Sequence, residues 1–433
     1  MIIPKFEMSS PLNSLERICT NIWNLIQVLS EARAFRVALF IWLTYASIIT
    51  VIVAIQPDRR TVTHEYRIAS QKWWEAKTSL YRGASGYLYL PQFAVFYSAY
   101  KSLPQRVGEP LWRITGLSLL AGALWIVSSR LNSGYANRLF LMATALALPS
   151  SFASARNGQV NLPLAALFIW IVLAIVTRRW WLAAIVLGTM LTMKPIIVAP
   201  MLVLAVLYHP LRVPLATILI ALGAVIFVHP NPQYVVGEYI HFAENLYIAS
   251  IPKFFAWCDF SGILYSLGIY LPAPLQFVLR AFAGLFTLVI CWKATKIEPP
   301  LHSVLLIVML CVIYLMLFNP RTETNSYVML GPFVGLTSAY LGVVLNKVKQ
   351  ATALLCVACL LGAENYGNPI FPWTNFWMKP LVTTLLSILV TYYIFRCAQK
   401  SKTVSAKSSP NAIITKSELS GDNGIQQITT IEN

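Results

Sequence analysis

Two acidic residues near the start of the chain have the chemistry of a general base. Asp58 directly follows a long apolar run and precedes Arg59 and Arg60, and Glu65 comes shortly before Tyr66 in the same polar segment. A carboxylate at such a boundary can remove a proton from the hydroxyl group of an acceptor. The alternatives are an ion pair between Asp58 and the arginines, and stabilisation of Glu65 by a helix dipole.

Two polar clusters interrupt otherwise apolar sequence further along the chain. The cluster at 156–161 supplies a candidate phosphate clamp and candidate hydroxyl binders: Arg156, Asn157, Gln159 and Asn161. The cluster at 319–327 supplies Arg321, a second candidate clamp, and Glu323, a candidate partner for an arginine. A bare turn needs only Asn-Gly or Asn-Pro, and charge inside a membrane is usually functional. We therefore expect both clusters to belong to a binding site, with Lys194 as a further cation that either binds phosphate or snorkels.

The composition indicates that these residues belong to an integral membrane protein. The 433 residues are 57% hydrophobic with a mean hydropathy of +0.64, and only 11% are charged. A soluble domain carries about 25% charged residues. The net charge of +17 comes mostly from Lys and Arg between apolar runs, where they orient membrane helices. We therefore expect membrane lipids, and no nucleic acid, as partners.

The apolar runs predict an all-α, polytopic fold with about twelve membrane-spanning helices. Each span needs about 20 apolar residues, and shorter runs count only with polar extensions. With the N-terminus inside, every predicted inner loop carries Lys or Arg, as the positive-inside rule requires. The predicted organisation is a cytoplasmic lead-in at 1–36, a transmembrane catalytic domain at 37–396 with outer loops at 56–113 and 229–274, and a disordered cytoplasmic tail at 397–433.

The first outer loop predicts two amphipathic helices on the membrane surface, the first with Thr63 as its N-cap. Basic residues outnumber acidic ones in this loop, although outer loops usually avoid positive charge. Such an excess favours a lipid-linked phosphate as ligand, and general attraction to anionic headgroups is the alternative. Metal-ligand spacings such as HExxH and the Walker and GxGxxG patterns do not occur in the sequence, so no metal or other cofactor is expected.

The chain resembles membrane glycosyltransferases of the GT-C class, and within them glycosyltransferase family 87. The resemblance covers roughly 37–345 and lies in an ordered set of short motifs: Tyr66-x-x-Ala69, Trp73-Trp74, Leu80-Tyr81, Tyr89-x-Pro91, Leu103-Pro104, Asn157-Gly158-Gln159-x-Asn161, Lys194-Pro195 and Asn319-Pro320-Arg321-Thr322-Glu323. It implies an inverting, metal-independent hexosyltransferase of the cytoplasmic membrane. Such an enzyme moves a sugar, often mannose, from a polyprenyl-phosphate donor to a lipid or glycan acceptor on the periplasmic or extracellular side.

The resemblance also bears on the base. The family usually places an aspartate about four residues before the loop tyrosine, where this chain has Val62. The base must then be Asp58 or Glu65, and Asp58 is favoured because GT-C enzymes generally place their base at the membrane boundary. Arg59 and Tyr66 are expected beside it in the substrate site.

Two other functions fit the same residues. A transporter or flippase for lipid-linked glycans predicts internal repeats and ionisable residues at mid-membrane. No clear repeat is visible, and most charges lie at the ends of the apolar runs. A catalytically inactive homologue fits the missing aspartate at Val62. The buried-looking Arg280 lies inside an apolar run, and the sequence names no partner for it.

Overall fold

The computed structural model describes residues 21–81, 87–250, 257–367 and 376–407, and within these ranges it contains helices and no strands. This agrees with the predicted all-α class. The lead-in is described only from residue 21, and α18 (Met378–Lys407) extends into the predicted tail. The remainder of that tail lies outside the described residues.

Seven helical segments are long and apolar enough to cross a membrane: Glu31–Ile55 (α2), Gln105–Leu131 (α5), Ser133–Asn157 (η1 and α6, Ala136–Asn157), Ala273–Ala294 (α13), Pro300–Phe318 (α14), Thr324–Val344 (η5, α15 and η6) and Met378–Cys397 in α18. Further apolar helices are α7 (Asn161–Val176), α8 (Trp180–Met193), α9 (Val198–Leu207), α10 (Arg212–Gly223) and α16 (Val348–Leu361), and these are shorter. The predicted count of about twelve spans is therefore not confirmed. The helices are interrupted by proline at Lys194-Pro195 and at His209-Pro210. The middle helices are therefore shorter than the usual membrane-spanning length.

The helices of the bundle differ in their surroundings. The side chains of α7 are buried on every face along nearly its whole length, whereas α13 exposes large apolar side chains such as Phe277, Phe282 and Leu285. A helix that is apolar all round belongs inside a large core or in lipid. The structure thus places α7 at the centre of the bundle, and the exposed apolar side chains of α13 suit contact with lipid.

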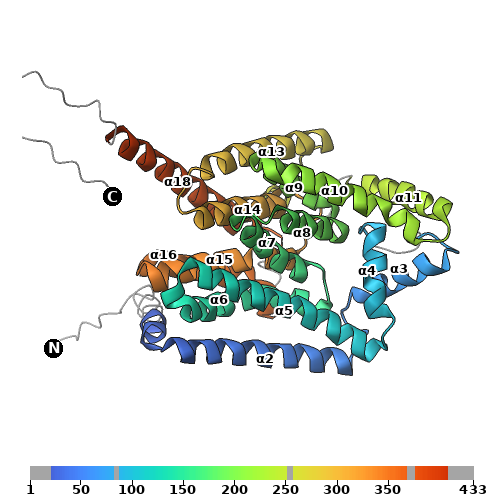
Figure 1. The fold of residues 1–433 in the computed structure, drawn as a ribbon, viewed down its shortest axis with the longest axis horizontal. Coiled ribbons are helices and arrows are strands. Elements are labelled where there is room, and N and C mark those ends of the chain that lie inside the picture. The colour runs from blue at the N-terminus through green and yellow to red at the C-terminus, as the bar shows by residue number, and fades with distance from the viewer. Residues whose placement is uncertain (1–20, 82–86, 251–256, 368–375, 408–433) are drawn as a thin grey trace, which may run out of the picture.

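Short helices from the two long loops form a cap at one end of the bundle (Figure 1, right). The first loop contributes α3 (Thr63–Glu75) and α4 (Pro91–Lys101), as predicted, and the second contributes α11 (Pro232–Ser250). His229 Nε2 lies 2.9 Å from the Trp73 carbonyl oxygen, and Glu238 accepts hydrogen bonds from Ser79 and from the backbone N–H of Leu80. These contacts join the two loops into one layer.

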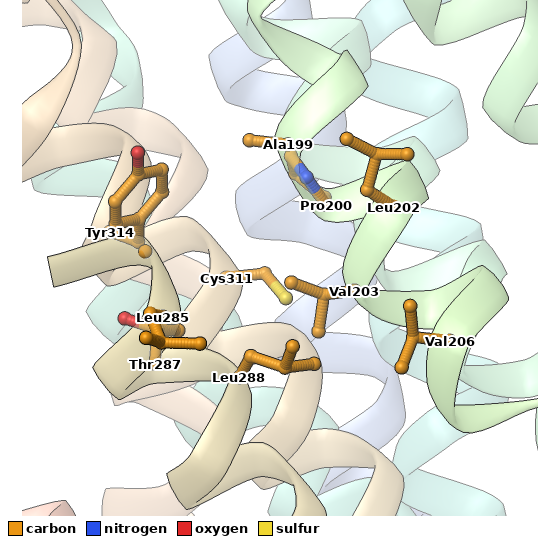
Figure 2. A pocket seen from close by; sticks show the side chains of 11 residues that line it. Ala199, Pro200, Leu202, Val203, Val206, Leu285, Thr287, Leu288, Cys311 and Tyr314 are labelled. Atoms are coloured by element: carbon orange, nitrogen blue, oxygen red, sulfur yellow. The ribbon is translucent and has the colours of Figure 1, made fainter. Parts of the chain in front are cut away.

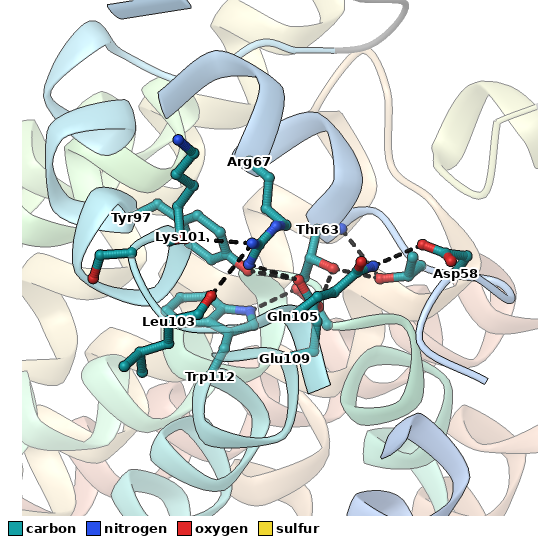
Figure 3. Close-up of polar contacts among 12 residues, drawn as sticks. Asp58, Thr63, Arg67, Tyr97, Lys101, Leu103, Gln105, Glu109 and Trp112 are labelled. Atoms are coloured by element: carbon teal, nitrogen blue, oxygen red, sulfur yellow. Dashed lines mark hydrogen bonds and ion pairs between the residues drawn. The ribbon is translucent and has the colours of Figure 1, made fainter. Parts of the chain in front are cut away.

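The predicted N-cap of α3 is wrong. Thr63 is the first residue of that helix, and the cap position is Val62, whose side chain makes no capping bond. The Thr63 hydroxyl instead donates to the carboxylate of Glu109 on α5 (Figure 3). A buried carboxylate competes for this hydroxyl because it is a stronger acceptor than a neutral group.

Glu109 and Arg113 form a buried ion pair that fastens the cap to the bundle. Glu109 is 0% exposed and Arg113 is 2% exposed, and their charged groups lie 2.8 Å apart. Arg113 also donates to the carbonyl of Arg156 at 3.1 Å and to the Thr61 hydroxyl at 3.0 Å. One guanidinium group therefore links α5, the end of α6 and the segment that leads into α3.

Replacing Glu109 with alanine is expected to destabilise the protein by about 3–5 kcal/mol, because it leaves the Arg113 charge buried without its carboxylate. The apparent melting temperature of the purified protein in detergent measures this. The matched control is Glu75→Ala, which removes an exposed carboxylate of α3 and should change stability by no more than about 0.5 kcal/mol. Equal melting of both variants would contradict the role assigned to the buried pair.

Candidate active site

The turn between α6 and α7 is held directly against the first outer loop. Gly158 ends α6 with a φ of +68°, a left-handed conformation that glycine adopts without strain. The N–H of Val62 donates to the Asn157 carbonyl at 3.0 Å, and the Trp112 indole donates to the Gly158 carbonyl at 2.8 Å. The segment that follows Asp58 and the cluster at 156–161 are thus brought together.

The same turn is joined to the cluster at 319–327 by amide side chains. Gln159 donates to the Glu323 carboxylate at 3.1 Å, and Asn161 donates to the Asn325 side-chain oxygen at 3.4 Å. Ser154 donates to the Asn325 carbonyl at 2.8 Å. Gln159 and Asn161 are both buried. Their amides therefore connect the two clusters, and the hydroxyl-binding role stays a prediction.

Tyr66 lies inside the cap and not on its surface. Its side chain is 1% exposed, its hydroxyl is 3.0 Å from that of Tyr89, and its ring contacts Tyr89, Phe93 and Tyr97 edge-on. Edge-to-face contacts of this kind add stability beyond area burial. The structure thus uses Tyr66 to position α3 against α4.

The candidate bases differ in exposure. Asp58 is exposed and accepts a hydrogen bond from Gln105 at 2.7 Å, and it forms no ion pair with Arg59 or Arg60 (Figure 3). Glu65 is partly buried in the first turn of α3, as expected. A carboxylate at the surface of the site is free to meet a substrate, so Asp58 satisfies this geometric requirement better than Glu65.

Arg156 lies near the two arginines that follow Asp58 in the chain. Arg59 and Arg60 are exposed, and both lie within electrostatic reach of the partly buried Arg156. Arg156 packs over the Phe152 ring at 5.8 Å and donates to the Asn157 side chain at 3.4 Å. Within the described chain none of the three pairs with a carboxylate. Their mutual repulsion favours an anion between them.

A second group of charges lies across the turn. Glu323 is exposed, and among the described residues it forms no ion pair with an arginine, although the sequence predicted one. The cation close enough to interact electrostatically with Glu323 is Lys194. Burial lowers the pKa of Lys194, and the nearby Glu323 carboxylate opposes that shift. Arg321 lies over the Trp257 ring at 5.8 Å. Guanidinium groups stacked in this way keep their N–H donors available for phosphate.

The sequence reasoning missed the buried ion pairs behind the site. Glu109 and Arg113 contribute to the excess of basic over acidic residues in the first outer loop, but the sequence analysis did not pair them. Their spacing of four residues was a usable signal, because it places both side chains on one helix face. Lys379 pairs with Glu364 and donates to the Thr324 carbonyl at 2.8 Å, which supports the 319–327 cluster from below. No local sequence pattern could have predicted the pairing of Lys379 with Glu364, because the sequence between them has no helical or strand periodicity.

The arrangement offers acid–base and anion-binding chemistry at one rim of the bundle. Two exposed carboxylates, Asp58 and Glu323, share this rim with a set of cations: Arg59, Arg60, Arg156, Lys194 and Arg321. A general base beside phosphate-binding cations suits the displacement of a phosphate leaving group. Among the described residues, no group of three or more His, Cys, Asp or Glu side chains could hold a metal ion.

Comparison with known proteins gives one family. The model of glycosyltransferase family 87 matches residues 87–320, a range that includes the α6–α7 turn, Lys194 and Arg280. Searches among curated proteins and among solved structures found no match.

Replacing Gly158 with alanine is expected to lower the melting temperature and the activity together. The added Cβ atom would lie 2.6 Å from Thr63 and 2.9 Å from the Arg113 guanidinium, in a backbone conformation that alanine disfavours. Gly122→Ala on α5 is the control, because its Cβ meets no atom within 4 Å and alanine favours the helix by about 1 kcal/mol. If both variants melt like the wild-type protein, the turn does not depend on this glycine.

Proposed function

The chain belongs to glycosyltransferase family 87, and on that premise we propose that it transfers a sugar from a polyprenyl phosphate to an acceptor hydroxyl at the membrane surface. The acceptor is a lipid or a glycan, and mannose is the sugar we favour. The observation that carries the proposal is that hydrogen bonds join the segment after Asp58, the 156–161 turn and Glu323. Arg59 and Arg60 lie near Arg156, and Lys194 lies near Glu323.

A lipid-linked phosphate donor fits the position of the cations. Arg59, Arg60 and Arg156 lie where α2 and α6 end, which is where the headgroup of a membrane lipid lies. Guanidinium groups bind phosphate through paired N–H donors. A donor with its tail in the bilayer reaches such a rim without leaving the membrane, whereas a soluble donor gains nothing from the apolar helices below it.

The proposed mechanism is a single displacement at the anomeric carbon. The Asp58 carboxylate removes the proton of the acceptor hydroxyl, and the oxygen attacks the anomeric carbon. The bond from that carbon to the phosphate oxygen breaks, and the bonding electrons leave with polyprenyl phosphate. Arg156, Arg321 and Lys194 stabilise the negative charge that develops on the leaving group. One displacement inverts the anomeric configuration, and none of these steps uses a metal ion.

The favoured base is Asp58 because it is exposed and carries a hydrogen bond from Gln105 that orients it. Glu65 is the second candidate, since the aspartate position of the family is Val62 here. The catalytic face we propose is the periplasmic or extracellular side of the cytoplasmic membrane. The Lys- and Arg-bearing short loops at the opposite end support that orientation.

Asp58→Asn is expected to lower the transfer rate by about 10²–10⁴-fold, because general-base catalysis contributes that factor. The assay gives the purified enzyme in nanodiscs a radiolabelled polyprenyl-phosphate mannose together with membrane lipid extract as acceptor. It measures both free polyprenyl phosphate and labelled product. Glu65→Gln is tested in parallel, and Glu75→Gln serves as an exposed carboxylate control on the same loop.

The assay also separates the rival functions. A flippase would move the labelled lipid across a vesicle membrane and leave the sugar–phosphate bond intact. Full transfer by both Asp58→Asn and Glu65→Gln would exclude these residues as the base. Turnover with a nucleotide sugar but not with the polyprenyl phosphate would contradict the proposed donor.

Replacing Arg156 with alanine is expected to raise the KM for the donor by roughly 10- to 100-fold, since a charged hydrogen bond contributes about 1.5–3 kcal/mol. The loss should shrink as salt increases, because salt screens the attraction between Arg156 and the donor phosphate in the wild-type enzyme. Arg138→Ala is the control, as this arginine pairs with Glu31 away from the cap. An unchanged donor KM in the Arg156 variant would remove this residue from the phosphate site.

A further inference from the structure

The interior of the bundle differs in charge from place to place. The groove between α9 and α13 has a volume of about 300 Å³, and the residues that line it carry no charge (Figure 2). At the start of α18, by contrast, Lys379 is only 1% exposed. Its partner Glu364 lies on η7 (Ala363–Asn365), and the Glu364 side chain is 7% exposed. An ion pair buried this deeply needs an explanation, because desolvation offsets much of its attraction.

Stability alone does not explain the pair. Lys379 is the second residue of α18, and the positive end of the helix dipole disfavours a cation in that turn. The Oε1 atom of Glu364 is buried and accepts no hydrogen bond from the part of the chain that the structure describes. A buried acceptor without a donor is destabilising. These two costs direct attention to the geometry that the pair fixes.

Lys379 fixes the backbone directly beside Glu323. Its ammonium group donates to the Thr324 carbonyl at 2.8 Å. The Thr322 carbonyl accepts from the backbone N–H of Cys258, also at 2.8 Å, just before α12 (Phe260–Ser266). The carbonyls on either side of Glu323 are therefore both held. This directs the Glu323 carboxylate to the α6–α7 turn, from which it accepts a hydrogen bond.

The other end of this linkage is anchored on α6. The Asn365 side chain donates to the Pro149 carbonyl at 2.8 Å, which joins η7 to the middle of α6. Ser154, further along the same helix, donates to the Asn325 carbonyl at 2.8 Å. The helix that ends at the 156–161 turn thus holds the 319–327 cluster directly, and a second time through η7 and its ion pair.

We propose that Lys379 and Glu364 are positioning residues for the transfer of the sugar. Their ion pair holds the Thr324 carbonyl, and this fixes Glu323 together with Arg321, two residues before it. The inference rests on the proposed function, because the proposed mechanism uses Arg321 to stabilise the leaving group. Lys379 is buried behind the cluster, so it acts through the backbone and not through contact with a substrate.

A double variant separates position from stability. Lys379→Met should lower the melting temperature, because it leaves the Glu364 carboxylate buried without its cation. Lys379→Met/Glu364→Gln removes both charges and should melt close to the wild-type protein, since replacing both partners of a buried pair is often neutral. The kcat of this double variant should nevertheless be lowered roughly tenfold, because the segment that carries Arg321 has lost a fixed point. The assay is the transfer assay proposed above.

Hydrogen–deuterium exchange reports on the cluster without relying on turnover. The backbone N–H of Ser326 donates to the Glu323 carbonyl at 3.0 Å. In the double variant, the peptide that covers 319–330 should exchange roughly fivefold faster than in the wild-type protein, because local opening becomes easier. The peptide that covers 161–176 should be unchanged.

The matched control neutralises an ion pair at the other end of α6. Arg138 and Glu31 lie 3.1 Å apart near the start of that helix. The variant Arg138→Met/Glu31→Gln should change neither kcat nor the exchange of 319–330. If Lys379→Met/Glu364→Gln does not fold, Glu364→Asp replaces it. That variant keeps both charges and draws the ammonium group away from Thr324, so it should lower kcat severalfold at an unchanged melting temperature.

The outcomes distinguish this inference from the proposed function. A double variant in which kcat recovers together with the melting temperature shows that the pair is only structural, and overturns the positioning role. Unchanged exchange of 319–330, or an unchanged kcat in a folded Glu364→Asp variant, also overturns it. If the wild-type enzyme transfers no sugar from a polyprenyl phosphate but exchange of 319–330 still rises in the double variant, the proposed function fails. The role of the pair in fixing the cluster then stands.

Discussion

The buried ion pair between Glu109 and Arg113 is the interaction on which the site depends. It joins the start of α5 to the chain that enters α3 and, through the Arg156 carbonyl, to the end of α6. A buried ion pair is not in itself a source of stability, because desolvation offsets much of its attraction. What it provides here is a fixed geometry, since the guanidinium must satisfy its donors in three different segments at once.

The polar residues around this pair divide into two groups with different tasks. The side-chain amides of Gln159 and Asn161 are buried, and they donate hydrogen bonds that join the 156–161 cluster to the 319–327 cluster. Asp58, Arg59, Arg60 and Glu323 are exposed at the rim. A polar binding site needs both kinds, because exposed groups make the contacts and buried groups fix where the contacts lie.

The membrane explains why these groups gather at one end of the bundle. Charge is costly in hydrocarbon, so helices such as α13 present apolar side chains along their length, and charge collects where the chain turns. Arg280 departs from this pattern, and its guanidinium donates to the side chain of Gln276, one turn earlier on the same helix. Membership of glycosyltransferase family 87 indicates that this arrangement serves the transfer of a sugar.

The sequence by itself determined the membrane class, the helical fold and the two helices of the first outer loop. These follow from composition and hydrophobic periodicity, which are local properties. It did not determine how many helices span the membrane, because proline breaks and burial by neighbours decide whether a short helix crosses. Only the tertiary structure decided that Tyr66 is buried, that the Thr63 hydroxyl donates to Glu109, and that Glu323 accepts a hydrogen bond from Gln159. It also decided that the Tyr314 hydroxyl meets the backbone of Arg280. Each of these depends on contacts between residues far apart in the chain, and no periodicity or spacing encodes which distant partner a side chain will meet.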